Sequence, residues 1–120
     1  MPRDARAYLA DIVESCAAIQ AATQYMTLQE YRTNRLVRSS VEREFIIIGE
    51  AMAALDRAAP QVFRSITKAR RIVDFRNQLT HEYPTVDDAI VWAIVETDVP
   101  VLVRESAALL TRLDSASPSA

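Results

Sequence analysis

At 120 residues, half of them apolar, the chain has the length and composition of one globular domain with its own core. Its single cysteine, Cys16, excludes an intramolecular disulfide and a cysteine-based metal cage, and its place in a helical pattern predicts a small core or boundary residue. No charged-then-apolar leader and no run of about 18 apolar residues occurs, so the sequence predicts a cytoplasmic protein rather than a secreted or membrane-spanning one.

The net charge of −2 hides a strong asymmetry along the chain. Residues 32–76 contain ten Lys or Arg and five Asp or Glu, a balance of +5, whereas residues 77–120 contain two and seven, a balance of −5. Residues 1–31, with two and four, add −2. Nearly all the cations are arginines, whose planar guanidinium suits phosphate and carboxylate groups. The basic middle indicates a polyanion, an acidic protein surface, or a solvated helix face with internal ion pairs.

Helical spacing of apolar residues dominates the chain, and its single glycine argues against a β-rich fold with many tight turns. Asp4 is a suitable start for a first helix, predicted over 4–24. Thr27 and Glu30 match the capping box, in which each side chain satisfies a free amide of the other residue. This pair predicts a short helix near 28–32.

The clearest amphipathic face lies in the predicted helix over 34–58. Its apolar positions step by three or four residues: Val37, Val41, Phe45, Ile48, Met52 and Leu55. Gly49 costs up to about 1 kcal/mol relative to alanine inside a helix, a penalty that makes sense if another backbone approaches there. Glu50 is either solvent-facing or a buried carboxylate with an arginine partner, and its apolar neighbours favour the second interpretation.

The next helix is predicted over 66–80, with Ser65 as its cap. Pro84 disfavours helical geometry at the residue before it, so this helix is expected to end at or just after His81. Its exposed side is expected to carry a basic strip that could bind RNA or phosphate, consisting of Arg64, Lys68 and Arg71.

A last long helix is predicted over 88–113, with Asp87 as its cap. Pro100 lies inside it and is expected to kink it, because proline removes one backbone hydrogen bond and crowds the preceding turn. Trp92 is predicted to be a core or interface anchor.

Four main helices and one short helix predict an all-α fold, an antiparallel helical bundle. It would form a single domain over residues 1–113. The remaining tail, 114–120, has nothing to bury and is expected to be disordered.

Chemically, the segment around the only histidine is the most informative. His81 follows Arg76 by five residues and precedes Tyr83 by two, so one segment holds a fixed cation, a base that titrates near neutral pH and a phenol. In a continuous helix Arg76 and His81 would lie about 140° apart, whereas a helix that loosens at Thr80 would bring them to one side. The alternative is that His81 is an ordinary polar residue at a helix end.

One histidine and one distant cysteine cannot form a transition-metal site, although acidic residues could hold a magnesium ion. Arginine with histidine suits phosphodiesters: the arginine neutralises the scissile phosphate and the histidine moves protons. In RNA the 2′-hydroxyl can be the nucleophile, so neither a metal nor a cofactor is required. A chain with one histidine can provide both a base and an acid by pairing with a second copy across a two-fold axis.

The pattern Arg76-Asn77-x-x-x-His81-x-Tyr83 resembles the R-x4-H-x-Y motif of HepT-like proteins, a branch of the HEPN superfamily. The resemblance extends over nearly the whole chain. The further segments that carry it are Arg3-Asp4, Ile48-Gly49-Glu50-Ala51, Ile72-Val73-Asp74-Phe75, Val91-Trp92 and Val99-Pro100-Val101-Leu102.

This resemblance implies a homodimeric HEPN fold and a metal-independent endoribonuclease, the toxin of a toxin–antitoxin pair whose antitoxin is an MNT-type nucleotidyltransferase. By position, Arg76 would bind phosphate and His81 would be the acid and base. Asn77 would orient the site, and Tyr83 would be the acceptor of AMP from the antitoxin. Glu82 departs from the family pattern, because many members have a small residue such as glycine there.

Two other interpretations remain open. The protein could be a non-catalytic helical module that binds a nucleotidyltransferase or a nucleotide, with Arg76 on a phosphate and His81 merely hydrogen-bonded. It could also be a dimeric structural protein. The basic middle fits RNA and an acidic antitoxin equally well, so charge does not separate these interpretations.

Overall fold

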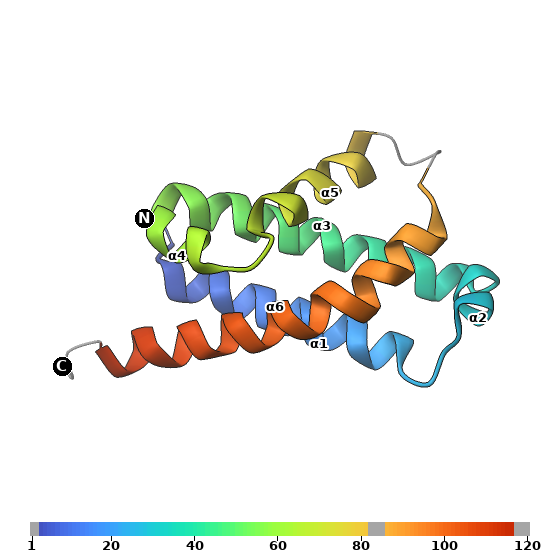
Figure 1. The fold of residues 1–120 in the computed structure, drawn as a ribbon, viewed down its shortest axis with the longest axis horizontal. Coiled ribbons are helices and arrows are strands. Elements are labelled where there is room, and N and C mark those ends of the chain that lie inside the picture. Colours follow the sequence, from blue (N-terminus) through green and yellow to red (C-terminus); the bar gives the residue numbers. More distant parts are fainter. Residues whose placement is uncertain (1–2, 82–85, 117–120) are drawn as a thin grey trace.

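The computed structural model describes residues 3–81 and 86–116, and in these residues it contains helices and no strand. The helices are α1 (Ala5–Thr23), α2 (Leu28–Arg32), α3 (Arg35–Ala58), α4 (Pro60–Ser65), α5 (Ala69–His81) and α6 (Asp88–Ala116). The long helices α1, α3, α5 and α6 run alternately in opposite directions (Figure 1). Helix α1 packs on α3 and α6, while α5 packs on α3. The predicted all-α antiparallel bundle is confirmed.

Side-chain caps begin three of these helices at the residues that the sequence predicts. Asp4 accepts a hydrogen bond of 2.9 Å from a backbone amide of the first turn of α1. Thr27 and Glu30 form the complete capping box, with the Glu30 amide 3.2 Å from the Thr27 hydroxyl and the Thr27 amide 2.9 Å from the Glu30 carboxylate. Asp87 accepts from the amide of Ala89 at 2.8 Å.

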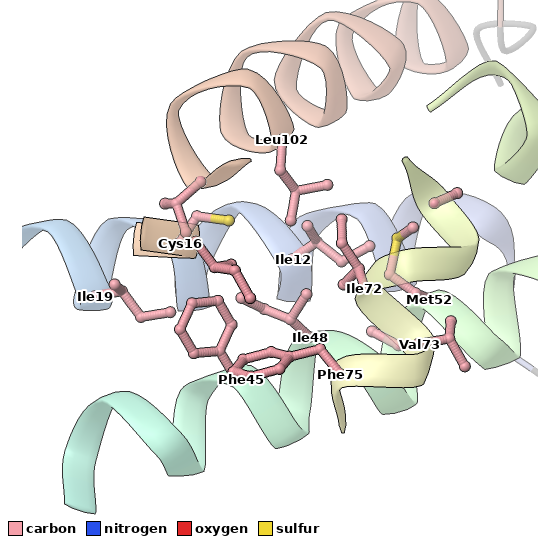
Figure 2. Close-up of a cluster of buried hydrophobic side chains, with 14 of the residues drawn as sticks. Ile12, Cys16, Ile19, Phe45, Ile48, Met52, Ile72, Val73, Phe75 and Leu102 are labelled. Atoms are coloured by element: carbon pink, nitrogen blue, oxygen red, sulfur yellow. The ribbon is translucent and has the colours of Figure 1, made fainter. Parts of the chain in front are cut away.

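The apolar faces of the four long helices meet in one core, part of which is drawn in Figure 2. Phe45 of α3 and Phe75 of α5 pack edge to face with their ring centroids 5.2 Å apart. Cys16 of α1 is fully buried, the first of the two positions expected for it, and burial raises the pKa of its thiol to about 12. Trp92 is also a core residue, with its ring 5.4 Å from that of Tyr31.

The segment between α3 and α5 differs from the prediction. Ser65 does not cap a helix over 66–80: it ends the additional short helix α4, and its hydroxyl donates to the carbonyl of Val62 at 2.7 Å. Pro60 begins α4 at a position where the amide that proline lacks would have no helical partner. Lys68 then adopts a left-handed conformation with φ of 58°, so α5 begins only after it.

Glu50 is exposed, so its interpretation as a buried carboxylate is wrong. Position 50 lies about 200° around the helix axis from positions 48 and 52. Because Ile48 and Met52 are fully buried, Glu50 must point outward despite its apolar neighbours in sequence.

Helix α6 continues without interruption through Pro100 and ends at Ala116, so residues 114–116 are helical rather than part of a disordered tail. Residues 117–120, the rest of that predicted tail, lie outside the described residues. The kink at Pro100 stays a prediction. No helix in the described part is long and apolar enough to cross a bilayer.

Candidate functional site

Arg76 lies on the buried side of α5. Ala69, Ile72, Val73 and Leu79 lie within about 60° of it around the helix axis, and all four are buried. Arg76 itself is half-buried. A charged side chain on an apolar face keeps its aliphatic part in the core and extends its charged end to water. The position of Arg76 in the helix therefore directs it toward α3, the helix on which α5 packs.

Gly49 of α3 provides the space for this side chain. A Cβ atom built at Gly49 would lie 2.1 Å from Cβ and 2.5 Å from Cγ of Arg76. The close approach expected at Gly49 is therefore real: α5 approaches α3 here, and the atoms that come nearest are the Cβ and Cγ of Arg76, next to the α5 backbone. The sequence contained both residues without indicating that they meet.

The Arg76 guanidinium is not paired within the described residues. Its Nε atom is buried and has no hydrogen-bond acceptor there, and no carboxylate of residues 3–81 or 86–116 forms an ion pair with it. A buried N–H without an acceptor is uncommon in native proteins. An arginine in this state keeps its charge and its donors for an anion such as a phosphate.

His81 is the last residue of α5 and is exposed, which confirms the predicted end of this helix. The helix does not loosen before it, and the Thr80 hydroxyl donates to the carbonyls of Arg76 (3.2 Å) and Asn77 (3.1 Å). His81 therefore stays about 140° from Arg76 around the axis and only about 40° from Asn77, which is also exposed. Glu82 and Tyr83 lie outside the described residues.

The basic strip is exposed as predicted, but two of its three cations are paired. The Nζ atom of Lys68 lies 3.9 Å and the Nε atom of Arg71 lies 3.5 Å from the carboxylate of Asp98 in α6. The Asp98 side chain is 4% exposed, whereas those of Lys68 and Arg71 are 52% and 51% exposed. No ion pair involves Arg64 in the described part of the chain.

Sequence reasoning missed Asp98, although a signal for it was present. Residues 94, 95, 99 and 102 surround position 98 on one face of α6, and all are buried. A carboxylate on such a face needs a cation or several donors. Two turns further along α6, Glu105 accepts from both the amide (2.8 Å) and the hydroxyl (2.7 Å) of Thr67. Two carboxylates of α6 thus hold the junction of α4 and α5.

A second polar cluster lies where α2, α3 and α6 meet. The Nε atom of Arg38 lies 3.9 Å from the carboxylate of Asp88. Burial raises the pKa of Glu42, and the negative charge of Asp88 adds to this shift. Burial also raises the pKa of Tyr31, whose hydroxyl has no hydrogen-bond partner among the described residues. In residues 3–81 and 86–116, no group of three or more His, Cys, Asp or Glu side chains is placed to hold a metal ion.

Comparison with known proteins agrees with the resemblance seen in the motif. A family model described as "Ribonuclease HepT-like" matches residues 12–109. A Methanocaldococcus jannaschii protein named "Putative RNase" is 33% identical over 86% of this chain and 94% of its own length. A Thermococcus cleftensis protein named "Probable ribonuclease HepT" is 28% identical over 85% of this chain and 92% of its own length. No solved structure matches significantly. The match over most of the chain, together with the 33% identity, shows that this protein belongs to the HepT-like ribonuclease family.

Proposed function

We propose that the protein is a metal-independent endoribonuclease in which Arg76 binds the scissile phosphate and His81 transfers protons. The observation that carries this proposal is the guanidinium of Arg76, which has no partner among the described residues and lies over Gly49 in a chain of a ribonuclease family. Its full charge suits the phosphate, on which negative charge develops during the reaction.

The chemistry needs only groups of the chain and of the RNA. A neutral imidazole removes the proton of the 2′-hydroxyl, and the 2′-oxygen then attacks the adjacent phosphorus. An imidazolium donates a proton to the 5′-oxygen as the P–O bond to it breaks. The products are a 2′,3′-cyclic phosphate and a 5′-hydroxyl. Asn77, on the same exposed side of α5 as His81, would orient the imidazole or the phosphate by hydrogen bonding.

We propose that two copies of the chain form the complete site. Arg76 and His81 point to different sides of a continuous α5, so a single chain does not direct both toward one phosphate. A two-fold axis can place the Arg76 of one copy beside the His81 of the other. Light scattering at micromolar concentration tests this proposal: a dimer is expected, and a monomer that still cleaves RNA would contradict it.

The regulatory part of the proposal comes from the motif. The protein would be a toxin of a toxin–antitoxin pair, silenced when an MNT-type nucleotidyltransferase antitoxin transfers AMP to the Tyr83 hydroxyl. The strip of Arg64, Lys68 and Arg71 would contact RNA phosphates beyond the scissile one. Mass spectrometry after incubation with such a nucleotidyltransferase and ATP should find one added AMP, absent from Tyr83→Phe.

Cleavage itself is tested with the purified protein, free of any antitoxin, on RNA in EDTA. Wild type should cleave, and His81→Ala should abolish cleavage without changing the circular dichroism spectrum. Arg76→Ala should also reduce cleavage. Arg70→Ala is its matched control and should not, because Arg70 lies on the same helix but pairs with Asp56 at 2.8 Å. No cleavage by wild type, with retained binding of a mononucleotide, would instead favour the non-catalytic binding module.

A further inference from the structure

We propose that Gly49 is the positioning residue for Arg76: the missing side chain at position 49 allows α5 to pack so closely on α3 that the Arg76 guanidinium is delivered to the phosphate. This inference rests on the proposed function, and it adds a residue outside the R-x4-H-x-Y motif. It concerns the only glycine of the chain, placed inside the 24-residue helix α3.

Backbone conformation does not explain this glycine. It lies in regular helix, and its φ is not positive, so an L-residue could adopt the same backbone. Glycine weakens a helix interior relative to alanine. Judged by helix propensity alone, alanine at position 49 would therefore stabilise the protein. The reason for glycine must lie in what surrounds it.

The contact with Arg76 is of a kind that cannot relax by a change of side-chain rotamer. The nearest atom to a Cβ at position 49 would be the Cβ of Arg76, at 2.1 Å. That atom is attached directly to the backbone of α5, so the overlap disappears only if the two helices move apart. Rotation about the side-chain bonds of Arg76 could move its guanidinium away, but it would not move its Cβ.

Helix α5 is held on both sides of this contact. Phe75, next to Arg76, packs on Phe45 of α3 with ring centroids 5.2 Å apart, and Leu79 is buried one turn later. At the other end, the ion pair of Arg71 with Asp98 ties the helix to α6. A side chain at position 49 would therefore tilt or lift α5 in its middle and displace Arg76 from its place against Gly49, which we call its seat.

The seat also determines which part of Arg76 is offered to a ligand. The stem lies against Gly49, and Nε is buried without an acceptor in the described part of the chain. Because the residue is half-buried as a whole, its exposed part is the terminal end of the guanidinium. A seat that restricts the stem reduces the rotamers available to the charged end, which is how supporting residues preorganise a site.

The test is a stability cycle between positions 49 and 76, which does not depend on ribonuclease activity. Gly49→Ala is expected to lower the melting temperature in the native background and in the Arg76→Ala background, where Cβ remains. In the Arg76→Gly background, which lacks that Cβ, the same substitution is expected to raise it. A higher melting temperature of Gly49→Ala in the native background would overturn the proposal. If Gly49→Ala alone does not fold, restored folding in the double variant with Arg76→Gly is the expected result, and failure to restore it overturns the proposal.

A second readout separates positioning from packing alone. In ¹⁵N spectra of the arginine side chains, one Nε–H signal is expected to exchange slowly with water and to disappear in Arg76→Lys. Gly49→Ala should shift that signal and lower kcat/KM for RNA by about 10²-fold, the effect of a displacement of about 1 Å at a reacting group. Glu50→Ala, at the exposed next position, should change neither.

The outcomes distinguish this inference from the proposed function. Gly49→Ala could lower the melting temperature in the native background and raise it in the Arg76→Gly background of a protein that does not cleave RNA. That result would support the role of Gly49 in positioning Arg76 and reject the proposed ribonuclease function. If the protein is an active ribonuclease but Gly49→Ala changes neither kcat/KM nor the Nε–H signal, Gly49 only relieves packing and the inference is wrong.

Discussion

Arg71 and Arg76 lie five residues apart on α5, and their surroundings are opposite. Arg71 is exposed, yet its Nε atom lies 3.5 Å from the buried carboxylate of Asp98. Arg76 is half-buried, and its Nε atom has no acceptor among the described residues. The exposed arginine therefore has an ion-pair partner within the chain, while the more enclosed one has none among the described residues and is the one proposed to bind the phosphate. Exposure alone does not identify the cation that binds a phosphate.

The strongest test of this comparison is to remove each arginine in turn. Arg76→Ala is expected to lower kcat/KM for RNA cleavage by about 10²–10³-fold, the loss typical of one preorganised donor at the transition state. Arg71→Ala should cost only a few-fold, because its charge is largely compensated by Asp98. Initial rates in EDTA measure both. Equal losses would contradict the distinction between the two arginines.

The role of Arg71 and Lys68 should appear in stability instead. Removing both cations leaves the buried carboxylate of Asp98 without an ion-pair partner in residues 3–81 and 86–116, which is expected to lower the free energy of unfolding by about 2 kcal/mol. This is below the about 3–5 kcal/mol of a fully buried pair, because both cations are half exposed. Urea unfolding of the double alanine variant measures the loss, and Asp98→Asn should cost less. A loss for Asp98→Asn larger than that of the double alanine variant would contradict the expectation that the cost comes from a buried carboxylate without its cations.

Freeing the same two cations should strengthen RNA binding. In the His81→Ala background, which is expected to prevent cleavage, Asp98→Asn is expected to raise RNA affinity a few-fold at low salt. It should also steepen the slope of log K against log salt by about 0.7, the value for one additional phosphate contact on a single strand, because the substitution removes one negative charge. Fluorescence anisotropy measures both quantities. Glu96→Gln removes the same charge from an exposed position of α6 and should leave the slope unchanged.

The smallest expected effect concerns a carboxylate whose burial is not fully compensated. The pKa of Glu42 is raised in the folded protein, so the folded state holds this proton more tightly than the unfolded state. The contribution of Glu42 to stability should therefore fall as the pH rises above the ordinary value of 4.5. Glu42→Gln should remove this contribution, so its stability relative to wild type should rise with pH and exceed that of wild type at neutral pH. Urea unfolding across this range checks the sign, and a less stable Gln variant at neutral pH would contradict it.

The amino-acid sequence by itself determined the helices, most of their ends and the family. Helix formation depends on spacing within one or two turns, and caps such as Thr27 with Glu30 or Asp87 act on residues at most three positions away. Such local signals can be read before any tertiary contact is known. The R-x4-H-x-Y motif was also contiguous, so the resemblance to HepT-like proteins did not depend on the fold. The roles of Arg76, His81 and Tyr83 remain predictions.

Only the tertiary structure decided which residues meet. The seat of Arg76 on Gly49, the pairing of Lys68 and Arg71 with Asp98, and the exposure of Glu50 all depend on how each helix is rotated toward its neighbours. The left-handed conformation of Lys68, which separates α4 from α5, likewise has no signal in the apolar pattern. Helical spacing determines the angle of a side chain around its own axis, but not what lies opposite. That is set by the packing of the whole core, in which every helix constrains the others.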